Sequence, residues 1–171
     1  AAFDNRGREA ASHIRSRLDA VKAQMEDALK LRTPGGKMSL GKYAWSPSSD
    51  KGDTVEGAYA NRDCLILKVG PNGGGDFRLQ LAVSPGRYRL EGKIQYKGVK
   101  AGEGDAKGLR LRTSGSAPDP KNPAAVGDGT WKSFAQEFAV TDGDPVLIAE
   151  LRGTAGEAGV DRSSLTLTRL P

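Results

Sequence analysis

Residues 85–100 read "PGRYRLEGKIQYKGVK", and the character of the side chains changes at every position along this stretch. Apolar residues such as Tyr88, Leu90 and Ile94 fall on one side, and charged or polar residues fall on the other. Period-two alternation is typical of a strand with one face in a core and one face in water. The stretch therefore predicts a central antiparallel strand over 86–97, since antiparallel sheets commonly expose one face.

Similar short stretches recur from residue 38 onward, separated by segments rich in Gly, Pro, Asp and Ser. The predicted strands span 40–45, 55–60, 63–69, 76–83, 86–97, 107–113, 131–140, 145–152, 156–161 and 164–170. Many short strands without intervening helical patterns predict an all-β fold, an antiparallel β-sandwich of the jelly-roll kind. The longest connection, 114–130, is predicted to be a surface loop, and "TDGDP" at 141–145 predicts a hairpin turn rather than part of a calcium loop.

Residues 5–32 have a helical period instead. Their apolar positions recur at alternating three- and four-residue steps: Ala11, Ile14, Leu18, Val21, Met25 and Ala28. This pattern predicts one N-terminal amphipathic α-helix that ends before Pro34. We expect residues 1–37 to form the helix and linker, and residues 38–171 to form the β-sandwich domain. The narrow stripe has two interpretations: the helix docks on its own sandwich, or it mediates homo-oligomerisation or continues an upstream helix.

The totals exclude several classes of protein. The 171 residues include 26 Lys and Arg against 21 Asp and Glu, a net charge of +5. This mild excess favours acidic partners through long-range attraction, but it is spread too evenly to indicate nucleic acid. No stretch approaches the roughly 18 consecutive apolar residues of a membrane span, so we expect no membrane insertion. The only cysteine, Cys64, lies in an apolar run, so no internal disulfide is expected.

Three segments resemble a known family when taken in order. They are "FRLQLAVSPGRYRLEGKIQYKGV" at 77–99, "GLRLRTSG" at 108–115 and "TWKSFAQEFAVTDGDPVLIAELRGTAGEAGVDRSSLTL" at 130–167. Together they resemble the non-catalytic carbohydrate-binding modules with the galactose-binding-like jelly-roll fold, over about residues 38–170. The resemblance implies a polysaccharide or other glycan as ligand and no enzymatic activity. It also implies an extracytoplasmic or secreted protein whose signal or anchor is not present in this chain.

The family resemblance raises the question of a structural calcium ion. Many relatives begin their last strand with an aromatic residue and two aspartates, one of which helps to hold calcium. Here the positions are Val160, Asp161 and Arg162, so only Asp161 carries over, with Glu157 as a second carboxylate. Calcium takes six to eight oxygen ligands, so most of the ligands would have to come from residues other than this pair. The alternative is a strand-terminal aspartate that bonds a turn.

Aromatic rings are the usual sugar contacts of such relatives, because a ring stacks on the apolar face of a pyranose. Trp45, beside "SPSSD", and Tyr59 are the freest candidates in this chain. Trp131 begins a predicted strand and is either a core or sheet-edge anchor or a stacking platform.

The polar strand faces supply the other predicted contacts. If strands 86–97, 107–113 and 145–152 share a sheet, their charged side chains line one surface. The predicted ligand-binding residues are Arg89, Lys93, Gln95, Arg110, Arg112, Glu150, Arg152 and Trp45. Because arginine binds carboxylate or sulfate groups through paired hydrogen bonds, an acidic or polar glycan is the expected ligand. The alternative is a solvated sheet face with Arg–Glu pairs.

Catalysis finds little support in the sequence. The sole histidine, His13, lies on the predicted helix, away from Cys64, so a nucleophile–histidine pair or a zinc site is not expected. Glycoside hydrolysis needs two carboxyl groups a few ångströms apart, and the predicted strands offer Glu91, Glu137 and Glu150. Neighbouring arginines, however, favour the ionised form of these groups, whereas one of them would have to act as an acid. We therefore expect a non-enzyme. The competing function is a structural or protein-interaction sandwich whose helix mediates oligomerisation or attachment.

Overall fold

The computed structural model describes residues 2–48, 53–70, 73–104, 107–116 and 120–171, with side chains from residue 6. Parts of the predicted connections, residues 49–52, 71–72, 105–106 and 117–119, lie outside the described residues. The helices are α1 (Ala2–Leu29), η1 (Lys30–Arg32) and η2 (Arg162–Ser164). The strands are β1 (Lys37–Ser39), β2 (Ser46–Ser48), β3 (Asp53–Tyr59), β4 (Arg62–Lys68), β5 (Gly75–Gln80), β6 (Gly86–Lys100), β7 (Gly108–Thr113), β8 (Gly127–Val140), β9 (Val146–Arg152), β10 (Ala155–Asp161) and β11 (Thr166–Arg169).

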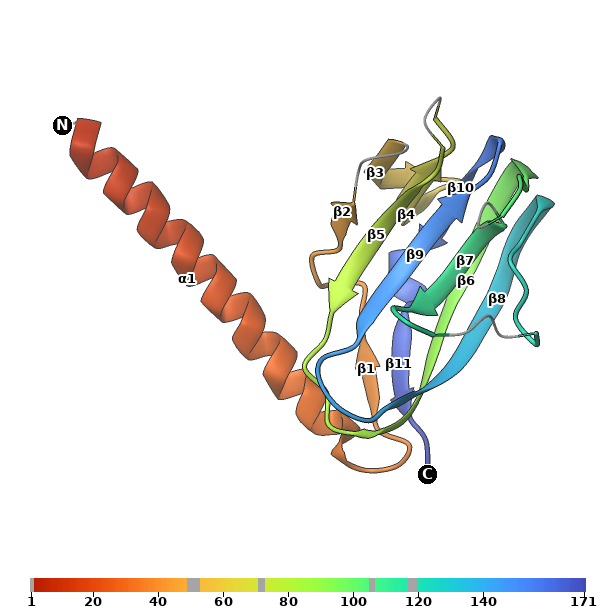
Figure 1. Cartoon of the computed structure of the whole chain (residues 1–171). Coiled ribbons are helices and arrows are strands. Elements are labelled where there is room, and N and C mark those ends of the chain that lie inside the picture. The colour runs from red at the N-terminus through yellow and green to blue at the C-terminus, as the bar shows by residue number, and fades with distance from the viewer. Residues whose placement is uncertain (1, 49–52, 71–72, 105–106, 117–119) are drawn as a thin grey trace.

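These strands form two antiparallel sheets that pack face to face, with α1 extending from one end (Figure 1). Sheet A has the order β1-β11-β6-β10-β4-β3, and β8 pairs with the other edge of β6. Sheet B has the order β2-β5-β9-β7. The predicted fold class, an antiparallel β-sandwich with one N-terminal α-helix, is confirmed.

Strand β6 is the central strand of sheet A. One of its edges pairs with β11 and then with β10, while the other edge pairs with β8 along most of its length. Tyr88, Leu90, Ile94 and Tyr96 are buried between the sheets, as the alternation predicts. Gly92 lies among them because a Cβ there would come within 2.9 Å of Leu165 Cδ2. Burial of each large side chain contributes about 1.5–3 kcal/mol to folding.

Two predicted elements are wrong for the same reason: the chain crosses between sheets there. Residues 40–45 connect β1 of sheet A with β2 of sheet B, and a turn from Leu40 to Tyr43 replaces the predicted strand. Residues 141–145 connect β8 of sheet A with β9 of sheet B, so they are not a hairpin turn. In a segment that crosses between sheets, buried side chains do not recur with the period of a strand. The local sequence pattern also does not indicate to which sheet the next strand belongs.

Helix α1 extends away from the sandwich, so the interpretation that it docks along its own sandwich is wrong (Figure 1). Every residue from 6 to 22 is exposed, including Ile14 and Leu18 of the apolar stripe. Among the described side chains of α1, those of the last turns contact the domain. There, Gln24 Nε2 donates a hydrogen bond to the Gln80 carbonyl at 3.0 Å, and Leu31 in η1 is buried. No helix in the described part of the chain is long and apolar enough to cross a membrane.

Candidate functional site

The predicted ligand-binding residues divide between the two outer faces of the sandwich and its core. Arg89, Lys93 and Gln95 lie on β6 in sheet A, whereas Arg110, Arg112, Glu150 and Arg152 lie on β7 and β9 in sheet B. The assumption of one shared sheet is therefore wrong, because the polar faces of packed sheets point in opposite directions.

Trp45 belongs to neither outer face. Its side chain is 2% exposed in the core, and its Nε1 donates a hydrogen bond to the Leu40 carbonyl at 3.2 Å. The expectation that Trp45 is accessible to a ligand is wrong, because the turn at Leu40–Tyr43 directs the following indole inward.

Glu150 is the centre of a cluster of charges on sheet B. Its buried carboxylate accepts hydrogen bonds from Arg112 Nε at 2.9 Å and Nη2 at 3.1 Å. Arg110 Nη2 lies 2.5 Å from the same carboxylate, and Arg152 Nε lies 3.2 Å from it. Arg152 also reaches Asp76 on β5 at 3.3 Å. The cluster therefore ties three neighbouring strands of sheet B together.

The charges of this cluster fix the state of Glu150. Burial opposes its ionisation, but hydrogen bonds from Arg112 and the charges of Arg112 and Arg110 outweigh that effect. The pKa of Glu150 is consequently held below its ordinary value of 4.5. Glu150 is thus an ionised structural partner at neutral pH and is unsuited to act as a proton donor. The arginine forks that it holds are correspondingly less available to a ligand.

The outer face of sheet A carries a different arrangement, centred on Trp131. The register between β6 and β8 shifts from Ile94↔Lys132 to Tyr96↔Gly129, so an extra β8 residue sits opposite Gln95. Trp131 is one of the two residues of this bulge, and it is half-buried on the outer face. The guanidinium of Arg62, from β4, lies over the indole with 4.6 Å between Arg62 Cζ and the ring centroid.

Tyr59 approaches the same region from the β3–β4 hairpin. Gly159 on β10 pairs with Gln95 of β6, and a Cβ at Gly159 would lie 2.5 Å from Tyr59 Cδ1. The absent side chain therefore allows the tyrosine ring to lie on the backbone of β10. The Tyr59 hydroxyl reaches Glu157 Oε1 at 3.4 Å. Tyr59, Gly159, Gln95 and Trp131 thus follow one another across the outer face of sheet A.

We name this set the aromatic strip: Tyr59, Arg62, Gln95, Trp131 and Gly159. Two aromatic rings supply apolar area, while guanidinium and amide groups supply directed hydrogen bonds. A pyranose needs both, because its ring has an apolar face and a rim of hydroxyl groups.

Several of the charges around the aromatic strip are paired with carboxylates. Arg89 lies 3.3 Å from Glu91, and both side chains are partly exposed. Lys93 is exposed two residues before Gln95 on the same face of β6, and its ammonium group has no ion pair within the described residues. Lys93 is therefore available to a carboxylate or sulfate group of a ligand.

Asp161 and Glu157, the two carboxylates considered for a structural calcium ion, have other partners in the structure. Asp161 accepts hydrogen bonds from the Ser163 amide at 3.0 Å and hydroxyl at 2.6 Å, and it pairs with Arg62. Glu157 lies four residues earlier, about 13 Å along the strand, and pairs with Lys68 at 3.7 Å. Within the described ranges, no group of three or more His, Cys, Asp or Glu is placed to hold a metal ion.

The role of Asp161 is structural instead. It caps the short helix η2, which matches the alternative of a strand-terminal aspartate that bonds a turn. Burial opposes its ionisation, but hydrogen bonds from Ser163 and Arg62 keep its pKa below the ordinary value. By pairing with Arg62, Asp161 also positions the guanidinium that covers Trp131.

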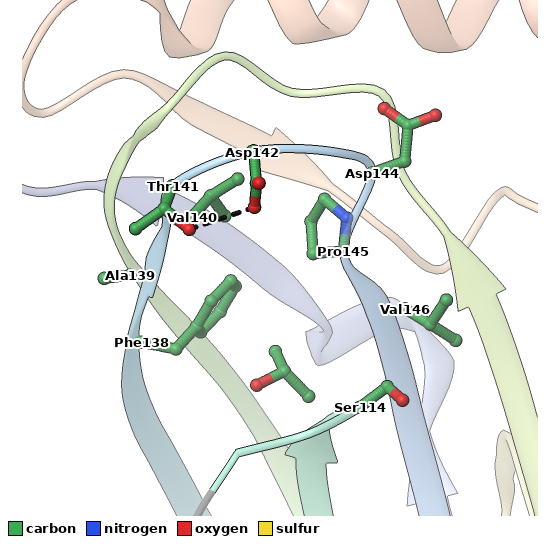
Figure 2. Close-up of a pocket in the computed structure, with 10 residues that line it drawn as sticks. Ser114, Phe138, Ala139, Val140, Thr141, Asp142, Asp144, Pro145 and Val146 are labelled. Carbon is green, nitrogen blue, oxygen red and sulfur yellow. Dashed lines mark hydrogen bonds between the residues drawn. The ribbon is translucent and has the colours of Figure 1, made fainter.

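A hollow of about 280 Å³ lies where β8 turns into β9, beside the end of β7. Figure 2 shows Phe138 at this hollow, with Asp142 turned toward Thr141, whose hydroxyl donates a hydrogen bond to it at 3.1 Å. Asp144 points away from Asp142 (Figure 2). The two carboxylates do not converge, and none of the predicted ligand-binding residues lines this space.

Sequence reasoning missed Arg62 and did not decide between two roles for Trp131. The alternation along β8 indicates that Trp131 faces outward. Trp131 shares its face with Ser133 and Glu137, opposite to the buried Phe134. No sequence signal linked Arg62 to Trp131, since these residues come from strands that are separated by β10 and β6.

Comparisons with known proteins give no family assignment. No family model matches the sequence, and no curated protein matches it. Among solved structures, the chain is similar to "BiXyn10A CBM1 APO", with 15% identity over 78% of this chain and 96% of that one and a TM-score of 0.46. It is also similar to a family 35 carbohydrate-binding module from Clostridium thermocellum, with 18% identity over 71% and 97% and a TM-score of 0.36.

Proposed function

We propose that this protein is a non-catalytic carbohydrate-binding module that binds its glycan on the outer face of sheet A. The observation that carries the proposal is the aromatic strip, in which Trp131 and Tyr59 share one face with the guanidinium of Arg62. Glycan recognition needs ring area together with planar hydrogen-bond donors, and the strip offers both on adjacent strands.

An acidic or polar glycan suits this face best. Lys93 places a positive charge without an ion pair within the described residues beside Gln95, whereas Arg62 is paired with Asp161 and Arg89 with Glu91. A carboxylate or sulfate on a sugar ring would pair with Lys93 while the ring contacts the aromatic strip. Of the residues predicted from sequence, Arg89, Lys93 and Gln95 belong to this binding proposal. The other predicted residues on sheet B stabilise that sheet in our proposal: Arg110, Arg112, Glu150 and Arg152.

The experiment is a glycan array with neutral, uronic-acid and sulfated glycans, followed by calorimetric titration of the best binder. We expect Trp131→Ala to weaken binding about tenfold, or about 1.4 kcal/mol, because one ring of the aromatic strip and the support for Arg62 are removed. Trp131→Phe should recover part of the affinity, and Lys93→Ala should weaken only charged glycans. Lys107→Ala, an exposed change directly before β7 of sheet B, is the control.

Two results would reject the proposal. One is the absence of saturable binding to any glycan on the array. The other is unchanged affinity in a Trp131→Ala variant whose unfolding free energy equals that of the wild type. An extracytoplasmic or secreted location, and the division at residues 1–37 and 38–171, are parts of the same proposal. Limited proteolysis tests the division: the stable fragment should lose the exposed turns of α1 before residue 23 and keep the sandwich together with the buried Leu31.

A second candidate function, a protein-interaction module, is favoured by the exposed stripe of α1. The two functions use different parts of the chain and are compatible with each other.

A further inference from the structure

Helix α1 presents an apolar stripe that nothing in the described chain covers. Ile14, Leu18, Val21 and Met25 are 59%, 64%, 54% and 58% exposed. They recur with the three- and four-residue spacing of a coiled-coil seam, in which apolar residues occupy the a and d positions of a heptad. The helix spans 28 residues, about 42 Å, and extends away from the sandwich (Figure 1).

The base of α1 is fixed to the domain, so the stripe is presented in a defined direction. Asp27 is buried, accepts a hydrogen bond from the Tyr43 hydroxyl at 2.5 Å and pairs with Lys30 and Lys42. Leu31 is buried directly after the helix. An exposed helix of apolar and charged residues that is anchored in this way is suited to receive a partner along its length.

The residues that flank the stripe are basic on both sides. In the heptad defined by the stripe, Arg15 and Lys22 occupy the e positions and Arg17 occupies a g position. The carboxylates of Asp19 and Glu26 lie at b positions, away from the seam. Lys22 and Glu26 lie 4.0 Å apart, but both are well exposed, so this pair is weak.

This charge pattern disfavours a second copy of the same helix. In a parallel pair, Arg17 of one chain would face Lys22 of the other, and an antiparallel pair would place Arg15 near other e-position cations. Like charges at these positions oppose association. The stripe also lacks the Trp and Phe that interfacial helices use at a membrane surface. The complementary surface is an apolar seam with carboxylates at its flanks.

We propose that α1 binds an amphipathic helix of another protein, one whose apolar seam is flanked by Glu or Asp. Apolar a and d residues of the two helices would interdigitate, and Arg15, Arg17 and Lys22 would pair with the partner's carboxylates. This interaction surface is separate from the aromatic strip of sheet A.

The test uses the full chain and two synthetic helical peptides with Leu along the seam. One peptide has Glu at its e and g positions, and the other has Lys there. By fluorescence anisotropy, the Glu peptide should bind at least about tenfold more tightly than the Lys peptide, and added salt should weaken this binding. The triple variant Arg15→Glu, Arg17→Glu, Lys22→Glu should reverse the preference.

Two further variants distinguish the effect of the apolar seam from the effect of the protein's net charge. Leu18→Gln with Val21→Gln should abolish binding of both peptides while leaving the helical circular dichroism in place. Lys37→Glu, Lys100→Glu and Lys107→Glu change the net charge equally on exposed sandwich positions and should retain the preference for the Glu peptide.

Three results would overturn the proposal. Equal affinity for the two peptides, or no binding of either, would exclude an acidic-flanked helical partner. Self-association in sedimentation that Leu18→Gln abolishes would assign the stripe to a second copy. Binding to phosphatidylserine–phosphatidylcholine vesicles without binding to the Glu peptide would assign it to a membrane surface.

Discussion

Glu150 illustrates how a single buried carboxylate organises one face of the sandwich. Three guanidinium groups converge on it, from β7 and from its own strand. Removing only the carboxylate charge would leave these cations without their partner in a site from which water is largely excluded. The residue therefore matters more for folding than its place on an outer sheet face would indicate.

We expect Glu150→Gln to lower the free energy of unfolding by about 3 kcal/mol near neutral pH, because a buried charge partner is lost. The pKa of Glu150 is depressed in the folded protein, so its contribution is present above the ordinary value of 4.5 and is lost as pH falls through the folded pKa. Urea titrations near pH 7 and near pH 3 measure both effects. Glu137→Gln, an exposed carboxylate on sheet A, should change stability by under about 0.5 kcal/mol. Equal stability of the Glu150→Gln variant and the wild type would contradict this account.

At the scale of elements, the junction between α1 and the sandwich depends on one ion-pair cluster. Asp27 belongs to the last turns of α1, and its partner Tyr43 belongs to the segment that crosses from sheet A to sheet B. Hydrogen bonds from Lys30, Lys42 and Tyr43 hold the pKa of Asp27 well below its ordinary value of 3.8. The direction of the helix thus relies on an ionised carboxylate.

Asp27→Asn should destabilise the protein by about 2 kcal/mol near neutral pH, which is the scale of a lost hydrogen bond to a charged group. Because the folded pKa is depressed, the native contribution is complete above pH 3.8 and declines as the pH falls below it. The difference between variant and wild type should therefore shrink near pH 3 in urea titrations. Asp19→Asn, on an exposed turn of α1, is the matched control. A difference that is independent of pH would contradict the ionised state of Asp27.

The elements themselves were largely predictable from sequence, and the reason is physical. Wherever one strand face is buried, period-two alternation fixes both the strand and its inward side, as in β6 with Tyr88 and Leu90. Residues 40–45 show the limit: Trp45 is buried, but it lies in a turn that crosses between sheets. The bulge beside Trp131 and the contact of Arg62 with its ring depend on register and strand order, which a local pattern does not contain.

At the scale of the whole molecule, strand order decides which charges share a surface. The charged faces of β6, β7 and β9 look equivalent in sequence, yet β6 lies in sheet A and the other two lie in sheet B. One face ties its arginines to Glu150, and the other leaves Lys93 exposed beside the half-buried rings of Tyr59 and Trp131. Helix α1 adds a third surface that contacts neither sheet along its exposed turns (Figure 1).

These surfaces should therefore be separable by truncation. Deleting residues 1–22 removes side chains that are exposed wherever the structure describes them, while keeping Asp27 and Leu31 at the junction. We expect the shortened protein to unfold at nearly the same urea concentration and to keep its glycan affinity, because neither the core nor the aromatic strip is changed. Binding of the Glu-flanked peptide should be lost, since the peptide's seam would have no counterpart. A parallel loss of glycan affinity would mean that the helix contributes to the binding face, and a large loss of stability would mean that its exposed turns support the sandwich.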